Sequence, residues 1–262
     1  MAKREWMENK KTDKSGAICE DEGLLVIFTP VEMEMKKQHF WLPLSVFGWS
    51  FWLPILLAGL ILTITLTMLC APLAWITGII TLLCLAFFRD PIRGIPGEPG
   101  VLVAPADGKV TEITRVERQE EFGGPALKIG IFLSVLDVHI NRSPCDGEVE
   151  SVDFTPGEFL DARHPESGLR NQATKIVLNM QGEDGPRKLI VRQIVGAIAR
   201  RIICPIERGD LLRRGERFGM IAFGSRTEII VPEPDAWRVM VEKNQQVKAG
   251  SSIVLRNISK GG

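Results

Sequence analysis

The sequence contains no tyrosine, only three histidines and no net charge. Its 32 basic and 32 acidic side chains balance, so there is no electrostatic reason to expect nucleic-acid binding. His39, His139 and His164 lie far apart in the chain. They are too few and too widely spaced to predict a metal site built from histidines. We therefore expect neither a nucleic-acid partner nor a metal ion.

The cysteines are few and scattered, and no two of them form a CxxC pair. An odd number at wide spacing is typical of reduced thiols in a cytosolic setting, and it argues against structural zinc. The five are Cys19, Cys70, Cys84, Cys145 and Cys204.

Charge is absent from one long stretch of the chain. Residues 40–88 contain no Asp, Glu, Lys, Arg or His, and the run is roughly twice the ~20 apolar residues that one membrane helix needs. Pro54 and Pro72 interrupt it. The pattern predicts a two-helix membrane hairpin with spans near Ser50–Cys70 and Pro72–Phe88. A pair of buried core helices is the alternative.

Basic residues flank this stretch on both sides. Lys36 and Lys37 precede it, and Arg89 and Arg93 follow it. Positive charge at both ends favours a hairpin with both ends in the cytoplasm. A cleavable signal peptide would be shorter and would lie at the very N-terminus. We therefore expect the cytoplasmic membrane as the location, with the rest of the chain on its cytoplasmic side.

The remaining sequence divides into three parts. Residues 1–39 form a variable N-terminal segment, and residues 89–100, with three prolines and three glycines, form a linker. Residues 101–262 contain short Val- and Ile-rich runs between turn signals. We predict for them a mainly β (α+β) soluble domain of packed antiparallel strands with short helices. The expected strands are Val101–Val103, Lys109–Val116, Leu127–Phe132, Gly147–Phe154, Lys175–Met180, Lys188–Val195, Arg200–Ile203, Met220–Phe223, Glu228–Val231 and Ser252–Asn257.

Four local clusters carry side chains suited to chemistry. Each alone has an ordinary structural explanation as a turn, a buried histidine, a solvated strand face or a β-bulge. An imidazole can also carry protons near neutral pH, and paired arginines can face an anionic headgroup. The clusters are PADGKV with Asp107, DVHINRSP with His139 and Arg142, IARRIIC with Arg200 and Arg201, and RFGMIAFGSRTE with Gly224 and Ser225.

In this order the four clusters resemble the phosphatidylserine decarboxylase proenzyme family, in its shorter bacterial and archaeal-like branch. The resemblance includes the hydrophobic hairpin, FFRDP at residues 87–91 and the FLDARHPESGLRNQ loop at residues 159–172. It implies an inactive chain that cuts itself between Gly224 and Ser225. The products would be a longer chain, 1–224, and a shorter chain, 225–262, in which Ser225 has become a pyruvoyl cofactor.

The resemblance also assigns roles to the other clusters. His139 would be the base that activates Ser225, and Asp107 the orienting carboxylate, as in a Ser-His-Asp arrangement. The other main branch of the family has a second histidine three residues after the first, where this chain has Arg142. Either His139 serves both self-cleavage and decarboxylation, which is our hypothesis, or one step relies on Arg142, Asp107 or water. Auxiliary candidates for contact with the substrate are Arg142, His164, Arg200 and Arg201.

The implied reaction converts phosphatidylserine to phosphatidylethanolamine and carbon dioxide through a Schiff base on the pyruvoyl carbonyl. The implied partners are the lipid substrate, the bilayer, the two chains of one precursor and a second copy of the chain, since the family often forms dimers. Two alternatives stay open. One is a pyruvoyl decarboxylase for another amino acid headgroup. The other is a membrane-anchored lipoyl- or biotinyl-like binding module, suggested by Gly209–Gly219, although the Met-Lys-Met triplet of such carriers is absent.

Overall fold

The structure is a computed structural model that describes residues 44–164, 166–180, 187–198, 201–221 and 224–258. The expected N-terminal segment, 1–39, and Arg200 lie outside the described residues. The chain from Leu42 onward forms one compact unit.

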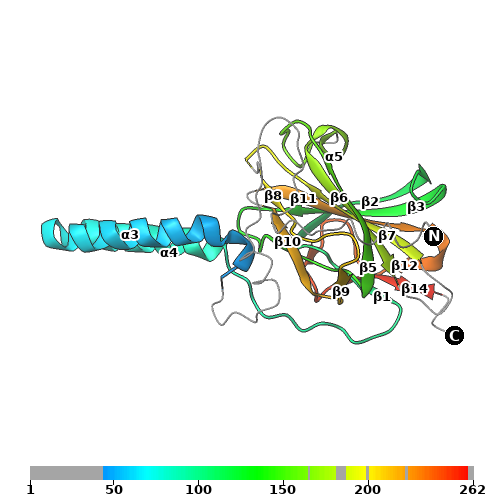
Figure 1. Cartoon of the computed structure of the whole chain (residues 1–262), viewed down its shortest axis with the longest axis horizontal. Helices are drawn as coiled ribbons and strands as arrows, with labels where there is room; N and C mark the ends of the chain where they lie inside the picture. Colours follow the sequence, from blue (N-terminus) through cyan, green and yellow to red (C-terminus); the bar gives the residue numbers. More distant parts are fainter. Residues whose placement is uncertain (1–43, 165, 181–186, 199–200, 222–223, 259–262) are drawn as a thin grey trace, which may run out of the picture. The chain divides into compact units, whose positions relative to one another are not determined.

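Both apolar segments are helical, as predicted. A short 3-10 turn, η1 (Val46–Gly48), leads into α3 (Trp49–Leu69), and α4 (Ala71–Phe87) follows after Cys70. The two helices lie side by side (Figure 1). The hydroxyls of Thr63 and Thr77 are 3.2 Å apart, and Gly59 leaves the space that Thr81 occupies.

The two helices differ in length. Val46–Leu69 has 24 residues and a mean hydropathy of 2.2, and 0% of its apolar window is buried. Among the described helices it alone is long and apolar enough to cross a membrane. With 17 residues, α4 is about 25 Å long, somewhat less than the ~30 Å of a bilayer core. Of the two spans expected, only the first therefore meets the length criterion.

The rest of the described chain is mainly β, as predicted. Its strands are β1 (Val101–Val103), β2 (Gly108–Gln119), β3 (Gly124–Leu133), β4 (Ile140–Arg142), β5 (Gly147–Thr155), β6 (Ala173–Met180), β7 (Arg187–Ile194), β8 (Ile202–Ile203), β9 (Leu211–Leu212), β10 (Arg217–Ile221), β11 (Ser225–Pro232), β12 (Trp237–Val239), β13 (Gln246–Val247) and β14 (Ile253–Asn257). One helical turn, α5 (Ser167–Arg170), and a 3-10 turn, η2 (Pro234–Ala236), complete it. The sequence did not predict β4, β9, β12 and β13, which have only two or three residues each and, unlike β1 and β8, no run of Val, Ile or Leu between turn signals that was recognised as a strand.

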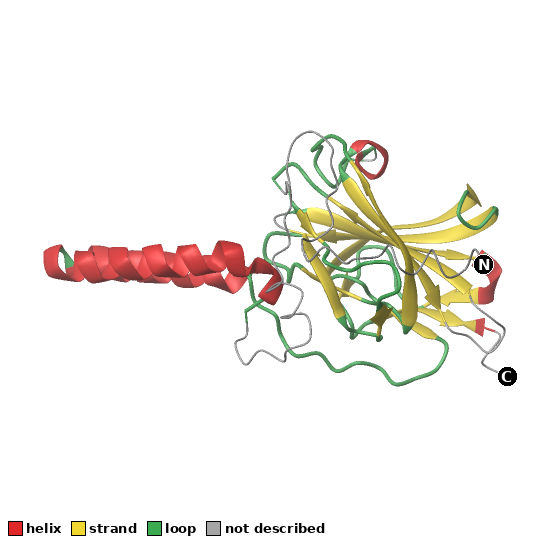
Figure 2. Ribbon diagram, in the orientation of Figure 1, coloured by secondary structure: helices red, strands yellow, loops and turns green. Residues whose placement is uncertain are grey.

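The strands form one large sheet and two small ones (Figure 2). The large sheet has the order β13-β2-β3-β11-β7-β6-β5-β9, and the small sheets have the orders β1-β14-β12 and β4-β10-β8. Each pairing between these strands is antiparallel. The main core contains Ile129 and Ile229 of the large sheet together with Leu102, Leu255 and Phe218 of the small ones. The small sheets therefore cover one face of the large sheet.

Strand β11 lies inside the large sheet, between β3 and β7, and is buried on both faces. Ile229 and Val231 belong to the main core, whereas Ile230 packs in a separate cluster on the other face. Because side chains alternate along a strand, Ser225 and Thr227 share the face of Ile229. The predicted Gly-Ser corner is thus the entry to a buried strand, with Ser225 turned toward the small sheets.

The end of α4 attaches the helices to the β domain. Phe87 and Phe88 are buried in one cluster with Trp52 of α3, Ile140 of β4 and Met220 of β10. The Phe87 ring also packs against His139, with 4.3 Å between the ring centroids. The apolar helices therefore reach the segment that carries the predicted base.

Residues 89–100, the expected linker, contain no helix or strand, and buried ion pairs hold them in place. Asp90 accepts a hydrogen bond from Arg142 at 2.7 Å and forms an ion pair with Arg217. Arg93 pairs with Asp107 at 2.6 Å. The segment therefore packs as part of the β domain.

Candidate active site

The side-chain amide of Asn141 joins three segments that are distant in sequence. It is fully buried. Its Nδ2 donates to the Pro105 carbonyl at 3.3 Å and to the Thr227 hydroxyl at 3.1 Å, and its Oδ1 accepts from Gln193 at 2.8 Å. Pro105 belongs to PADGKV, Asn141 to DVHINRSP and Thr227 to the chain that follows the Gly-Ser corner. One amide thus connects three of the four predicted clusters.

This junction places the predicted catalytic residues in one region. Asp107 lies two residues after Pro105, His139 two residues before Asn141, and Ser225 two residues before Thr227. Two residues of extended chain span at most about 7 Å. Sequence reasoning selected these three residues but missed Asn141, although Asn141 stands inside the DVHINRSP motif.

The Gly224–Ser225 corner combines an unusual backbone with an unsatisfied hydroxyl. Gly224 has φ +64°, in the left-handed region that favours glycine, and a Cβ added there would meet nothing within 4 Å. Ser225 is fully buried, and its Oγ has no hydrogen-bond partner within the described chain. A buried hydroxyl without a partner is costly, and such groups are uncommon in native proteins.

His139 is buried and neutral. Only 1% of it is exposed, and neither ring nitrogen has a hydrogen-bond partner among the described residues. Burial lowers the pKa of the imidazole from 6.5 to about 4, and the backbone and charge of Asp137 offset part of this shift. At neutral pH the ring can therefore accept a proton.

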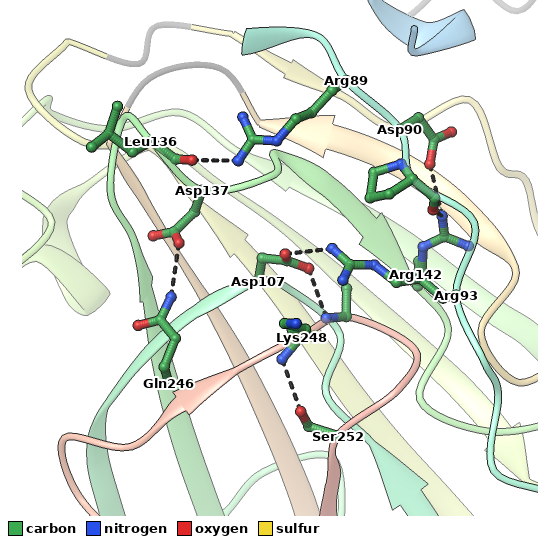
Figure 3. A network of polar contacts seen from close by, with 12 residues as sticks. Arg89, Asp90, Arg93, Asp107, Leu136, Asp137, Arg142, Gln246, Lys248 and Ser252 are labelled. Atoms are coloured by element: carbon green, nitrogen blue, oxygen red, sulfur yellow. Dashed lines mark hydrogen bonds and ion pairs between the residues drawn. The ribbon is translucent and has the colours of Figure 1, made fainter. Parts of the chain in front are cut away.

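Asp107 lies between two donors. Its Oδ2 accepts from the Arg93 guanidinium at 2.6 Å (Figure 3), and its Oδ1 accepts from the backbone N–H of Ala249 at 2.8 Å. Burial raises the pKa of the carboxyl group, against the opposing effects of the Ala249 hydrogen bond and the Arg93 charge. Since Ser225 Oγ and both His139 nitrogens lack partners, the structure brings the three residues to one region without a Ser-His-Asp hydrogen-bond chain among the described residues.

A second carboxylate, Asp137, also faces this region, and sequence reasoning did not select it. It accepts from the Ser134 backbone and hydroxyl at 2.8 and 2.7 Å and from Gln246 at 2.8 Å (Figure 3). Its charge raises the pKa of both His139 and Asp107. Asp137 is therefore the carboxylate whose charge acts on both predicted catalytic groups.

Arg142, which the resemblance matches to the second histidine of the other branch, holds the 89–100 segment. Its guanidinium donates to Asp90 at 2.7 Å (Figure 3) and to the carbonyls of Pro91 and Gly215 at 3.1 and 3.0 Å. An arginine stays protonated in proteins and so cannot replace a histidine as base. These contacts give Arg142 a structural role.

His164 and Arg201, the other auxiliary candidates that the structure describes, make their contacts with residues outside the Asn141 junction. His164 is exposed, and its Nδ1 accepts from the Glu166 backbone at 3.3 Å. The Arg201 guanidinium lies 5.3 Å from the centroid of the Phe51 ring in the first turn of α3. Among the described residues no group of three or more His, Cys, Asp and Glu side chains is placed to hold a metal ion.

Comparison with known proteins identifies the family. The family model for phosphatidylserine decarboxylase matches residues 80–255. A phosphatidylserine decarboxylase proenzyme of Rhodopirellula baltica is 39% identical over 221 residues, which cover 80% of this chain and 91% of that protein. This chain belongs to the phosphatidylserine decarboxylase family. A second proenzyme, from Desulfotalea psychrophila, is 39% identical over 185 residues, or 71% of this chain and 84% of the relative.

Membership of the phosphatidylserine decarboxylase family makes the chain an enzyme of the carboxy-lyase class. The alternative of a binding module without catalysis is thereby wrong. The matched residues include the end of α4 and all four clusters that carried the resemblance.

The Arg142–Asp90 pair yields a test of the structural role of Arg142. Removing one partner of a buried ion pair costs about 3–5 kcal/mol, and we expect the lower end for Arg142→Ala because Arg217 still contacts Asp90. Urea unfolding of the full chain in detergent measures this. Arg170→Ala removes an exposed arginine that contacts Glu158 and Glu166 and serves as the control, with little expected change. Equal effects of the two substitutions would contradict the assignment.

Proposed function

We propose that this chain decarboxylates phosphatidylserine to phosphatidylethanolamine, using a pyruvoyl group made from its own Ser225. The observation that carries the proposal is the buried, unpartnered hydroxyl of Ser225 directly after a left-handed glycine, in a chain of the phosphatidylserine decarboxylase family. Such a hydroxyl gives up no hydrogen bond when it attacks.

Self-cleavage uses groups that are already in this region. The Ser225 Oγ attacks the Gly224 carbonyl carbon, and an ester forms as the peptide C–N bond breaks. Removal of the Ser225 α-proton then expels the Gly224 carboxylate, and water replaces the nitrogen, which leaves as ammonia. Neutral His139 is the proposed base. The missing His139 hydrogen bonds do not exclude it, because catalytic hydrogen bonds often tighten only as the reaction proceeds.

The residues around Ser225 fit a pyruvoyl group at that position. Ser225 is the first residue of β11, and the pairing of β11 with β3 and β7 would hold the new chain end in place. Once bound to the substrate amine, the pyruvoyl carbonyl supplies an electron sink as carbon dioxide leaves. The protein supplies burial, the His139 proton acceptor and the carboxylates Asp107 and Asp137.

The helices suit a substrate whose acyl chains stay in a bilayer. The apolar window of Val46–Leu69 is not buried, and His139, the proposed base, packs against Phe87 at the end of α4. Arg89 follows the last residue of α4 by two positions, and the Arg201 guanidinium lies over the Phe51 ring in the first turn of α3. We propose that α3 and α4 insert into the cytoplasmic membrane and hold the active site at its cytoplasmic surface, where the two arginines face the lipid phosphates.

Ser225→Ala tests the proposed function. We expect a single uncut chain that releases no carbon dioxide from phosphatidylserine vesicles, because both the nucleophile and the source of the cofactor are gone. Ser151→Ala, which removes a hydroxyl that contacts Asp153 on β5, should cut and react normally. Carbon dioxide release from free serine at the same rate as from the lipid would refute the lipid substrate. Carbon dioxide release by Ser225→Ala would refute the pyruvoyl mechanism.

His139→Ala tests the proposed base. Loss of a general base typically slows a reaction by roughly 100-fold or more, and the time course of cutting after cell-free synthesis measures this. The pH profile gives a second measurement. A base with a pKa of about 4 stays neutral down to about pH 5.5. The rate of cutting should therefore be nearly constant between about pH 5.5 and about pH 8, and it should fall below about pH 5.5. A fall centred near pH 6.5 would contradict a buried His139 as base.

A further inference from the structure

Gly196, in the turn after β7, lies against the bond that the proposed function cuts. A Cβ built on Gly196 would lie 1.9 Å from the Gly224 carbonyl oxygen and 3.0 Å from its carbonyl carbon. The next nearest atom to that Cβ position is the Ala162 Cβ, at 3.3 Å. The scissile carbonyl therefore occupies the space that any side chain at residue 196 would need.

The two glycines are required for different reasons. Gly224 has a left-handed φ and open space around it, so it serves the backbone conformation. The φ of Gly196 lies outside the positive range in which side chains are strained. At residue 196 the constraint is space alone, and the atoms that take this space belong to the scissile peptide.

A buried amide fixes the position of Gly196. Asn171 is 3% exposed, and its Nδ2 donates to the carbonyls of Val195 and Leu160 at 2.8 Å each, while its Oδ1 accepts from the Leu160 N–H at 2.9 Å. The Val195 N–H donates to the Gln172 carbonyl at 3.1 Å. The residue immediately before Gly196 is thus held on both its N–H and its C=O side.

The loop at residues 159–172 completes this arrangement. Ala162, which faces Gly196, is buried, and its carbonyl accepts from the Ser167 hydroxyl at 3.1 Å. Arg192 of β7 donates to the Gly168 carbonyl at 2.7 Å, and it pairs with the buried Glu228 of β11 at 3.0 Å. The loop is therefore fixed both to the strand that begins at Ser225 and to the strand that leads to Gly196.

We propose that Gly196 is a positioning residue for self-cleavage, with Asn171 and the 159–172 loop as its support. The inference rests on the proposed cutting of the Gly224–Ser225 bond. Contact with the Gly196 backbone fixes the direction of the Gly224 carbonyl, and so fixes the face that the carbonyl carbon presents to Ser225 Oγ. The same space must accommodate the oxygen when attack makes the carbon tetrahedral.

Gly196→Ala is the direct test. The added methyl group must displace the Gly224 carbonyl, and misplacing a reacting group by about 1 Å costs about 100-fold in rate. We expect cutting of the freshly synthesised full chain, followed by intact mass, to slow by about that factor. Gly147→Ala is the matched control, because its Cβ would lie 2.8 Å from a carbonyl oxygen of β6, that of Asn179, and it should cut normally.

Two further measurements separate a local effect from unfolding. The unfolding midpoint of uncuttable Ser225→Ala, with and without Gly196→Ala, reports the structural cost, and a cooperative transition well above the assay temperature shows that the slower cutting does not come from unfolding. Asn171→Asp keeps the size and the acceptor of Asn171 but loses both N–H donors, and it should also slow cutting. If Gly196→Ala does not fold, Asn171→Asp decides the question.

The outcomes separate this inference from the function it rests on. If the unaltered chain stays uncut, the proposed self-processing fails. If the unaltered chain cuts and Gly196→Ala cuts at the same rate, or if Gly147→Ala slows equally, the role of Gly196 is refuted. If Gly196→Ala does not fold and Asn171→Asp cuts at the normal rate, the positioning role of Gly196 is also refuted.

Discussion

The buried amide of Asn141 is the constraint on which the site depends. Its hydrogen bonds join chain segments that are 36, 52 and 86 residues apart, and each satisfies a polar group that has no access to water. A buried donor or acceptor left without a partner costs about 1–3 kcal/mol. The four segments can therefore be buried together only in a register that satisfies this amide, and in that register Asp107, His139 and Ser225 belong to one region.

Burial then sets the chemistry of the site. The end of α4 covers His139 with an aromatic ring and removes the imidazole from water, which keeps it neutral. The same exclusion of water leaves the Ser225 hydroxyl without a partner. A precursor that must react only with itself benefits from both effects, because no solvent competes for the base or for the nucleophile. The apolar helices and the reacting groups are thus parts of one packed arrangement.

Part of this could be predicted from the sequence. The spans expected at Ser50–Cys70 and Pro72–Phe88 differ from α3 and α4 by one residue at each end, because charge and proline limit an apolar run sharply. The longer strands and Asp107, His139 and Ser225 were also selected in advance. Asn141, Arg93 and Gly196 were not, because their importance arises from contacts with distant backbone and side chains. Arg142 was considered for chemistry, but the structure gives its guanidinium to Asp90, a partner that nothing in the local motif indicates.

The central claim is that this chain makes its own cofactor at Ser225, and the intact mass of the purified protein tests it most directly. The account predicts two chains, 1–224 and 225–262, with the shorter one lighter by one ammonia molecule than its sequence requires. Reaction with a hydrazine reagent should add to the shorter chain alone, as expected of a terminal carbonyl. A single uncut chain of 29.1 kDa, or a shorter chain that still begins with an unmodified serine, would contradict the account.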